Sequence, residues 1–131
     1  MDGLFSREWV EQFAAKWNAD PDMVNPLNAI GFNAIVAFGY MNAEHPAILL
    51  EITDGKVQKA GLYNPKTNPV IDWDLRATPE QWLAWKKSPL TLSKLGVTVS
   101  SGQLQFLKGD YRKMIRNPNM ATAFLRCFNL L

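Results

Sequence analysis

Residues 70–82 read VIDWDLRATPEQW and place a strand directly before a helix. Over 71–77, apolar residues occupy alternate positions and charged residues lie between them, which predicts a strand with one buried side and one solvent-facing side. The helix then begins with Thr78 as N-cap, Pro79 in the first turn and Gln81 placed to close a capping box. This junction fixes the order of elements around the middle of the chain.

Two acidic residues of the strand resemble a catalytic pair. Asp72 and Asp74 lie two residues apart and therefore share a face, as carboxylates for general acid and base work would. Arg76 lies on the same face, and alternating charges are typical of the polar side of a half-buried strand. We therefore interpret these residues as surface charges.

Upstream of this junction the sequence predicts one helix and three strands. Ser6 caps a helix whose apolar residues recur at three- and four-residue steps from Trp9 to Trp17. A turn-rich break follows over 18–26, and 27–32 is a short apolar piece that can form one helical turn. The predicted strands cover 33–41, 47–53 and 56–64. A hairpin at Asp54-Gly55 joins the last two.

Downstream the sequence predicts helices and one more strand. A short helix covers 90–95, and 96–102 has no clear state because it contains Val-Thr-Val. The fifth strand, QLQFLKG, covers 103–109, and the rest is helical in two pieces divided near Asn117-Pro118. This order predicts an α+β fold, with a largely antiparallel five-stranded sheet and a single domain over 1–131.

Composition excludes several classes of function. The 131 residues include 14 basic and 12 acidic side chains, and a net charge of +2 gives no strong field for nucleic acid. One histidine and one cysteine cannot supply a structural zinc site, and no calcium or phosphate-binding motif occurs. We expect neither a metal nor a cofactor. No segment approaches the roughly 20 apolar residues of a membrane span, and no secretory signal is visible, so we expect a cytoplasmic protein.

No catalytic residue emerges either. His45, the only histidine, lies in a predicted loop, and no nucleophile motif accompanies it. Cys127 lies in an apolar stretch, where a free thiol behaves as a small hydrophobe. We therefore expect a protein that is not an enzyme.

The C-terminal segment has an unusual apolar density. Apolar residues over 114–131 cover more than one helical stripe, so some of this surface must face something besides one sheet. The methionines suit an adaptable apolar pocket or serve equally as core filler; they are Met23, Met41, Met114 and Met120. Four basic residues favour a solvated helix face, with contact to an acidic membrane surface as the alternative; they are Arg112, Lys113, Arg116 and Arg126.

The second half resembles the sterol carrier protein type two family. The resemblance rests on the strand from Val70, the capped TPEQW helix, the short helix after Ser88-Pro89, the strand GQLQFLKGD and the closing apolar helix. The family's strand-end pattern is matched by Gly102, Leu104, Gly109 and Asp110. The likeness covers about residues 5–131. It departs at 96–101, which is longer than the family's second helix and turn, and at 117–118, where the final helix is broken.

This resemblance implies a tunnel between sheet and helices that holds a sterol, fatty acid, acyl thioester or other long apolar ligand. We expect Trp73 and Trp82 to lie close to it. From strand parity and helix spacing, the candidate wall residues are Phe32, Val36, Phe38, Ile48, Leu50, Trp73, Trp82, Leu104, Phe106, Met114, Phe124 and Phe128.

Two alternatives stay open. The chain can be an accessory or interaction module that presents a lipid-like intermediate to a partner enzyme through an exposed apolar C-terminal helix. It can also be an enzyme on an apolar substrate that uses His45, Asp72 or Tyr111, although their spacing does not favour this.

Overall fold

A computed structural model describes residues 5–67, 70–109 and 111–131, apart from the side chains of 111, 114 and 115. The helices are α1 (Arg7–Ala19), α2 (Pro21–Ala29), α3 (Pro79–Lys87), α4 (Leu92–Ser100), α5 (Tyr111–Arg116) and α6 (Pro118–Leu125). The strands are β1 (Ala34–Tyr40), β2 (Ile48–Thr53), β3 (Lys56–Leu62), β4 (Trp73–Ala77) and β5 (Gln105–Lys108). Two short 3-10 turns, η1 (Pro65–Thr67) and η2 (Arg126–Asn129), complete the chain. All five predicted strands are present.

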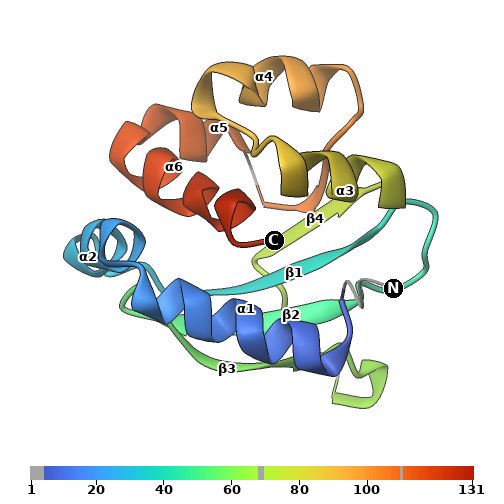
Figure 1. Cartoon of the computed structure of the whole chain (residues 1–131), viewed down its shortest axis with the longest axis horizontal. Coiled ribbons are helices and arrows are strands. Elements are labelled where there is room, and N and C mark those ends of the chain that lie inside the picture. Colours follow the sequence, from blue (N-terminus) through green and yellow to red (C-terminus); the bar gives the residue numbers. More distant parts are fainter. Residues whose placement is uncertain (1–4, 68–69, 110) are drawn as a thin grey trace.

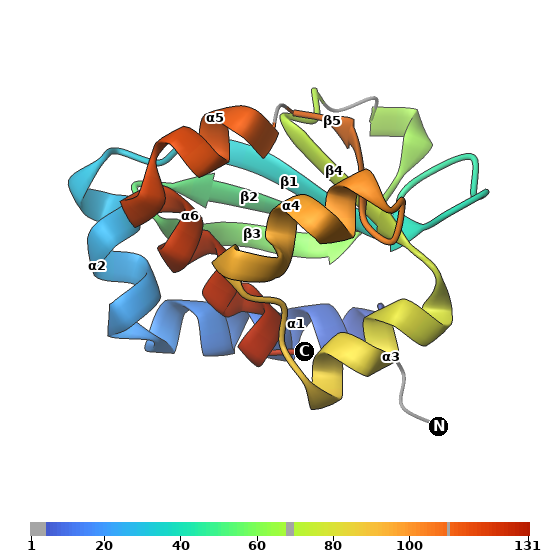
Figure 2. The same ribbon diagram turned by 90° about the horizontal axis from the view of Figure 1, so that it is seen from above.

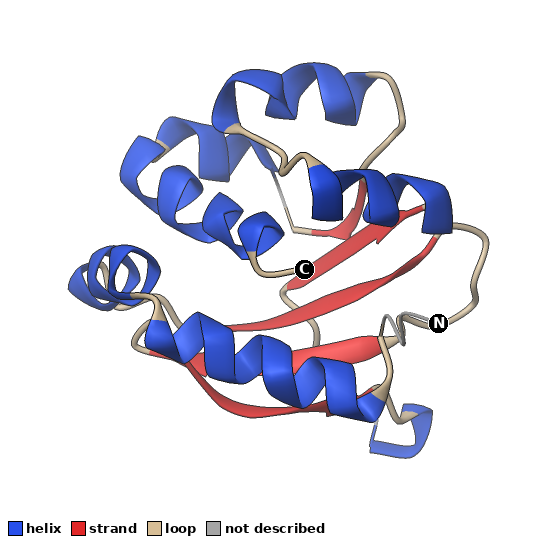
Figure 3. Ribbon diagram, viewed as in Figure 1, coloured by secondary structure: helices blue, strands red, loops and turns tan. Residues whose placement is uncertain are grey.

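The five strands form one mixed sheet in the order β3-β2-β1-β4-β5. Strands β1 and β4 are parallel, and the other neighbouring pairs are antiparallel. The helices gather on one side of this sheet, with α1 over the β2/β3 half and α3 to α6 over the other half (Figures 1, 2 and 3). The expected α+β fold with a mainly antiparallel sheet is confirmed.

The connection from β3 to β4 begins on the side of the sheet that faces away from the helices, which we call the far face, where Asn64 and Thr67 of this crossover approach Ile35 and Leu49. At its end, the Asp72 backbone N–H donates to the Ile35 carbonyl at 2.9 Å. The Ile35 N–H donates in return to the Asp72 carboxylate at 2.8 Å. These two bonds fasten the crossover to β1 and bring β4 alongside it in parallel.

Helix α2 overturns the predicted break over 18–26. Asp20 is its N-cap and accepts a hydrogen bond from the Asp22 N–H at 3.1 Å, with Pro21 in the first turn. Proline is tolerated there because the first helical N–H groups have no intrahelical partner. The turn-forming residues of this stretch therefore begin a helix, and the Met23 side chain of that helix is fully buried.

Helix α4 settles the state of 96–102. It runs through Val-Thr-Val to Ser100, and Leu95 and Thr98 are buried on its inner side. The intrinsic cost of β-branched residues in a helix is only a few tenths of a kcal/mol, so burial of one face outweighs it.

Strand β4 is buried on both sides, and the prediction of a solvent-facing side is wrong. The Arg76 Nε donates to the Asp74 carboxylate at 2.7 Å, and the two side chains are 3% and 7% exposed. The same guanidinium donates from Nη1 to the carbonyl of Ala43 at 2.9 Å and of Tyr40 at 3.2 Å. The β1–β2 loop thus folds over this part of the far face. Asp72 alone of the three charges stays exposed.

The predicted hairpin between β2 and β3 is present. Asp54 and Gly55 both adopt positive φ, at 50° and 84°. A Cβ at Gly55 would lie 2.7 Å from the Asn28 backbone nitrogen, so α2 packs directly against this turn. The indole N–H of Trp17 donates to the Gly55 carbonyl at 2.9 Å and ties α1 to the same point.

Candidate functional site

The layer between sheet and helices is an apolar and strongly aromatic interior. The Phe38 ring of β1 lies 5.8 Å from Phe13 and 5.4 Å from Trp82, measured between ring centroids. Trp82 in turn stacks on Phe128 at 6.2 Å with nearly parallel planes. Phe124 of α6 lies 6.4 Å from Trp73 of β4. Side chains from both halves of the sequence therefore meet in one core.

The buried side-chain polar atoms described in this interior have hydrogen-bond partners. The Trp82 indole N–H donates to the Gly39 carbonyl at 2.9 Å, and that of Trp9 donates to the Leu131 carbonyl at 3.4 Å. Among the described residues, no buried side-chain nitrogen or oxygen lacks a hydrogen bond. An interior of this kind offers a ligand apolar contact only, since a polar group placed in it would lose its hydrogen bonds to water.

The structure brings the candidate wall residues together in this interior. Ten of the twelve are buried, Phe106 is half-buried, and the side chain of Met114 lies outside the described residues. The buried ones are Phe32, Val36, Phe38, Ile48, Leu50, Trp73, Trp82, Leu104, Phe124 and Phe128. Their side chains pack against one another in one cluster. Trp73 and Trp82 are both buried in this cluster, and their expected proximity to a ligand tunnel stays a prediction.

Helix α1 contributes aromatic side chains to this interior that are not among the predicted wall residues. Phe13 and Trp17 are buried, and Trp17 reaches Phe124 with ring centroids 6.1 Å apart. Phe5, just before the helix, contacts Trp82 at 5.2 Å. The signal was present in the spacing of the aromatic residues from Trp9 to Trp17, which identifies a buried helix face but not which part of the core it meets.

The C-terminal segment faces inward, contrary to the exposed contact surface that the accessory hypothesis assigned to it. Phe124, Leu125, Cys127, Phe128 and Leu131 are all buried. The physical reason is that α6 and the turn η2 after it lie between α2, α3 and α4. These neighbouring helices cover the apolar residues of the segment on more than one side.

Helices α4 and α5 pack mainly on α6 and form the outer part of the helical layer. Three of the four basic residues noted in the sequence lie exposed on α5: Arg112, Lys113 and Arg116. The fourth, Arg126, donates to the Asp20 carboxylate at 2.9 Å, and this hydrogen bond raises the pKa of the guanidinium. Arg126 therefore joins η2 to the start of α2 and does not extend the basic surface of α5.

Two shallow hollows open in the helical layer. One, of about 290 Å³, lies between α2 and α6 beside Ile30 and Thr122. The other, of about 180 Å³, lies between α6 and the segment around Leu90 and Thr91. None of the candidate wall residues lines either hollow. The buried wall residues pack against one another away from both hollows.

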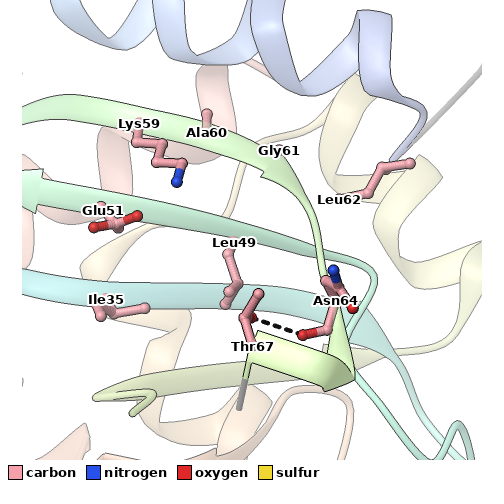
Figure 4. A pocket seen from close by; sticks show the side chains of 9 residues that line it. All are labelled: Ile35, Leu49, Glu51, Lys59, Ala60, Gly61, Leu62, Asn64 and Thr67. Atoms are coloured by element: carbon pink, nitrogen blue, oxygen red, sulfur yellow. Dashed lines mark hydrogen bonds between the residues drawn. The ribbon is translucent and has the colours of Figure 1, made fainter. Parts of the chain in front are cut away.

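A separate hollow of about 380 Å³ lies on the far face, beneath the crossover (Figure 4). Ile35 of β1 and Leu49 of β2 form its half-buried apolar floor. The exposed side chains around it include Glu51, Lys59, Asn64 and Thr67. We call this space the far-face hollow. The strand alternation did not point to it, because the crossover that roofs it has no regular pattern.

The residues considered for catalysis do not converge. His45 is half-exposed in the β1–β2 loop, stacks on Tyr63 at 5.3 Å, and lies 4.0 Å from Glu44. The Asp72 carboxylate accepts a backbone N–H of β1, and the side chain of Tyr111 lies outside the described residues. Cys127 is buried, and burial raises the pKa of its thiol far above the ordinary 9.0, which keeps the sulfur protonated.

Within residues 5–67, 70–109 and 111–131, no three His, Cys, Asp or Glu side chains gather as metal ligands would. In the same part of the chain, no helix combines the length and the apolar character needed to cross a membrane.

Comparison with known proteins identifies the fold. No protein-family model matches the sequence, and no curated protein matches it significantly. Solved structures do match. A crystal structure of sterol carrier protein 2 has a TM-score of 0.70 and 16% identity, over 97% of this chain and 95% of that one. A Thermus thermophilus protein described as possibly a sterol carrier protein gives 0.64 and 16%, over 95% and 86%.

A third structure, the ubiquinone synthesis protein UbiJ-SCP2, gives a TM-score of 0.61 at 11% identity, over 99% of this chain and 93% of that one. At these identities the likeness shows the fold alone. The chain therefore has the sterol carrier protein fold over nearly its whole length, and the resemblance expected from the sequence is confirmed at that level.

Proposed function

We propose that this chain, which has the sterol carrier protein fold, binds a long apolar molecule such as a fatty acid, sterol or acyl thioester between its sheet and its helices. The observation that carries the proposal is the aromatic interior, in which Trp17, Phe38, Trp82 and Phe124 meet and every described buried side-chain nitrogen and oxygen has a hydrogen-bond partner. Such an interior recognises apolar shape and offers no group for catalysis.

The names of two proteins with this fold agree with an apolar ligand. One is a palmitated sterol carrier-like protein of Aedes aegypti, with a TM-score of 0.50 and 16% identity over 92% of this chain and 94% of that one. The other is the ubiquinone synthesis protein already described. A ligand of this class needs no metal and no cofactor to be held.

The energetics of binding favour a ligand with a long chain. Burying a methylene group gains about 0.8 kcal/mol, so ten of them gain about 8 kcal/mol. Against this stand the loss of ligand motion, about 4–15 kcal/mol, and the displacement of side chains that now fill the interior. We infer that α4, α5 and α6 move outward on binding, because α4 and α5 pack mainly on α6.

Energy transfer from the buried tryptophans to a fluorescent fatty acid, cis-parinarate, tests the site. Phe106→Asn places an amide beside Trp73, whose ring lies 6.0 Å from Phe106. Leu49→Asn is the matched control, since Leu49 is also half-buried but lies on the far face. We expect saturable transfer in the unaltered protein, at least fivefold weaker binding in Phe106→Asn, and no change in Leu49→Asn.

The reverse order of the two variants would place the fatty acid on the far face and refute the proposal, as would a protein that shows no saturable transfer. Native mass spectrometry of freshly purified protein, followed by organic extraction, complements this test. A lipid released at about one molecule for each chain would name the ligand class.

The accessory role remains the second candidate, and its support is the fold shared with a ubiquinone synthesis protein. In that role the chain would present its apolar ligand to a partner enzyme and not only carry it. A complex with that enzyme that persists after delipidation would favour this role, whereas transfer of parinarate between vesicles by the chain alone would favour a carrier. We place the chain in the cytoplasm, with transient membrane contact through the basic residues of α5 as part of the same proposal.

A further inference from the structure

We propose that the far-face hollow binds a small zwitterion with an apolar side chain, of the class of the free apolar α-amino acids. This hollow lies on the opposite side of the sheet from the apolar interior. The inference therefore goes beyond the proposed lipid binding and does not rest on it.

The floor of the hollow fits an apolar side chain of limited size. Ile35 and Leu49 are half-buried on adjacent strands and present aliphatic surface. Gly61 of β3 pairs with Leu49, and a Cβ built on it would meet no atom within 4 Å, so the space above it is open. A volume of about 380 Å³ is near the lower end of the roughly 300–1,000 Å³ of small-molecule pockets. It suits a small molecule better than a lipid chain.

Charges of both signs border the same space. Glu51 and Lys59 are register partners on β2 and β3 and lie on the side of the strands that faces the hollow (Figure 4). Partners in an antiparallel pair have Cβ atoms about 4.5–5.5 Å apart. In the described part of the chain, neither side chain takes part in an ion pair or hydrogen bond. An α-amino acid carries its ammonium and its carboxylate on one carbon and can therefore meet both of these neighbouring charges at once.

The surroundings set the orientation of this ligand. A second hollow of about 270 Å³ shares Ile35 and Glu51 and adds Asp72, so the Glu51 end is acidic and favours the ammonium group. At the crossover, the Asn64 carbonyl oxygen Oδ1 accepts the Lys66 N–H at 3.0 Å, which leaves the amide Nδ2 as a donor. Asn64 therefore offers a donor to the ligand carboxylate from the crossover end, and the Lys59 ammonium offers one beside Glu51.

Titration of the ¹⁵N-labelled full chain with L-leucine, followed through its amide spectrum, tests this assignment. 4-Methylpentanoate and isoamylamine are matched probes, because each keeps the branched carbon skeleton up to the α-carbon and only one of the two charges. We expect saturable shifts in β2, β3 and residues 64–67 with L-leucine, and at least fivefold weaker binding of both single-charge probes.

Two variants separate the site from the rest of the fold. Gly61→Val fills the open space with a residue that favours strands, and Glu51→Gln combined with Lys59→Gln removes both exposed charges. We expect each to weaken L-leucine binding at least fivefold and to leave parinarate binding unchanged. Gly96→Ala on α4, another position with open space, is the control that keeps L-leucine binding.

Three results would overturn the assignment. They are the absence of saturable shifts with L-leucine, equal binding of 4-methylpentanoate or isoamylamine, and full L-leucine binding by the Gly61→Val protein. The same amide spectra report whether each variant is folded. If the unaltered protein did not bind parinarate, this result would count against the lipid proposal and not against the far-face hollow.

Discussion

Removal of one partner of the buried ion pair of β4 should lower the free energy of unfolding by several kcal/mol. Asp74→Ala removes the carboxylate from a guanidinium that is 3% exposed. Breaking a buried pair by removing one partner costs about 3–5 kcal/mol, because the remaining charge is uncompensated. Arg76 keeps the carbonyls of Tyr40 and Ala43 as acceptors, so we expect the lower end, about 3 kcal/mol.

This loss is large beside the roughly 5–15 kcal/mol that stabilises a typical domain. With a urea m-value of about 2 kcal/mol/M, the unfolding midpoint falls by about 1.5 M. The assay is urea unfolding followed by tryptophan fluorescence. The double variant Asp74→Leu with Arg76→Met leaves no buried charge, and we expect it to lose only about 1 kcal/mol, from the two carbonyls that lose a donor.

Glu51→Ala is the matched control, since this exposed acid has no ionic partner among the described residues, and its effect should stay within about 0.5 kcal/mol. A cost below about 1 kcal/mol for Asp74→Ala would mean that water reaches the pair. A double variant as unstable as the single one would show that the uncompensated charge is not the cause.

Three further changes test the backbone and the core. Thr78→Ala removes the oxygen that accepts the Gln81 N–H at 3.1 Å and should cost about 1 kcal/mol in thermal or urea unfolding. Gly55→Ala meets both a positive φ of 84° and the α2 backbone, and should cost about 2 kcal/mol or more, whereas Gly96→Ala in open space should stabilise α4 by up to about 1 kcal/mol. Because burial raises the pKa of the Cys127 thiol, the folded state holds a proton that the unfolded state releases above pH 9.0. Stability should therefore fall as the pH rises above that value, by up to about 1.4 kcal/mol for each pH unit. In Cys127→Ala this part of the pH dependence should be absent. The same burial predicts that a thiol reagent labels the native protein only after unfolding.

Local chemistry is where sequence reasoning succeeded. The N-caps at Ser6 and Thr78 form as predicted, with backbone N–H groups of Trp9 and Gln81 as their donors. The return bond from the Gln81 side chain, which would close the predicted capping box, is not among the hydrogen bonds of the described residues. The hairpin at Asp54-Gly55 also forms, since its positive φ values depend on two neighbouring residues. The missed helix over 21–29 shows the limit of such reasoning, because Asp20 and Pro21 serve equally in a turn and in a helix start.

Strand faces were harder to predict, because burial depends on what covers a sheet. The alternation in β4 is real, yet the β1–β2 loop folds over Arg76 and buries the polar side as well. The far-face hollow has the same origin, since Asn64 and Thr67 reach Ile35 and Leu49 only through the path of the crossover.

The sequence by itself determined the order of the five strands, the N-caps at Ser6 and Thr78 and the apolar character of the future interior, because these depend on residue type and short-range spacing. Only the tertiary structure decided that α1 supplies Phe13 and Trp17 to that interior, that the C-terminal residues turn inward, and that Glu51 and Lys59 border a hollow. The physical reason is that periodicity states which side of an element avoids water. The neighbour that covers it is chosen by packing between segments far apart in the chain.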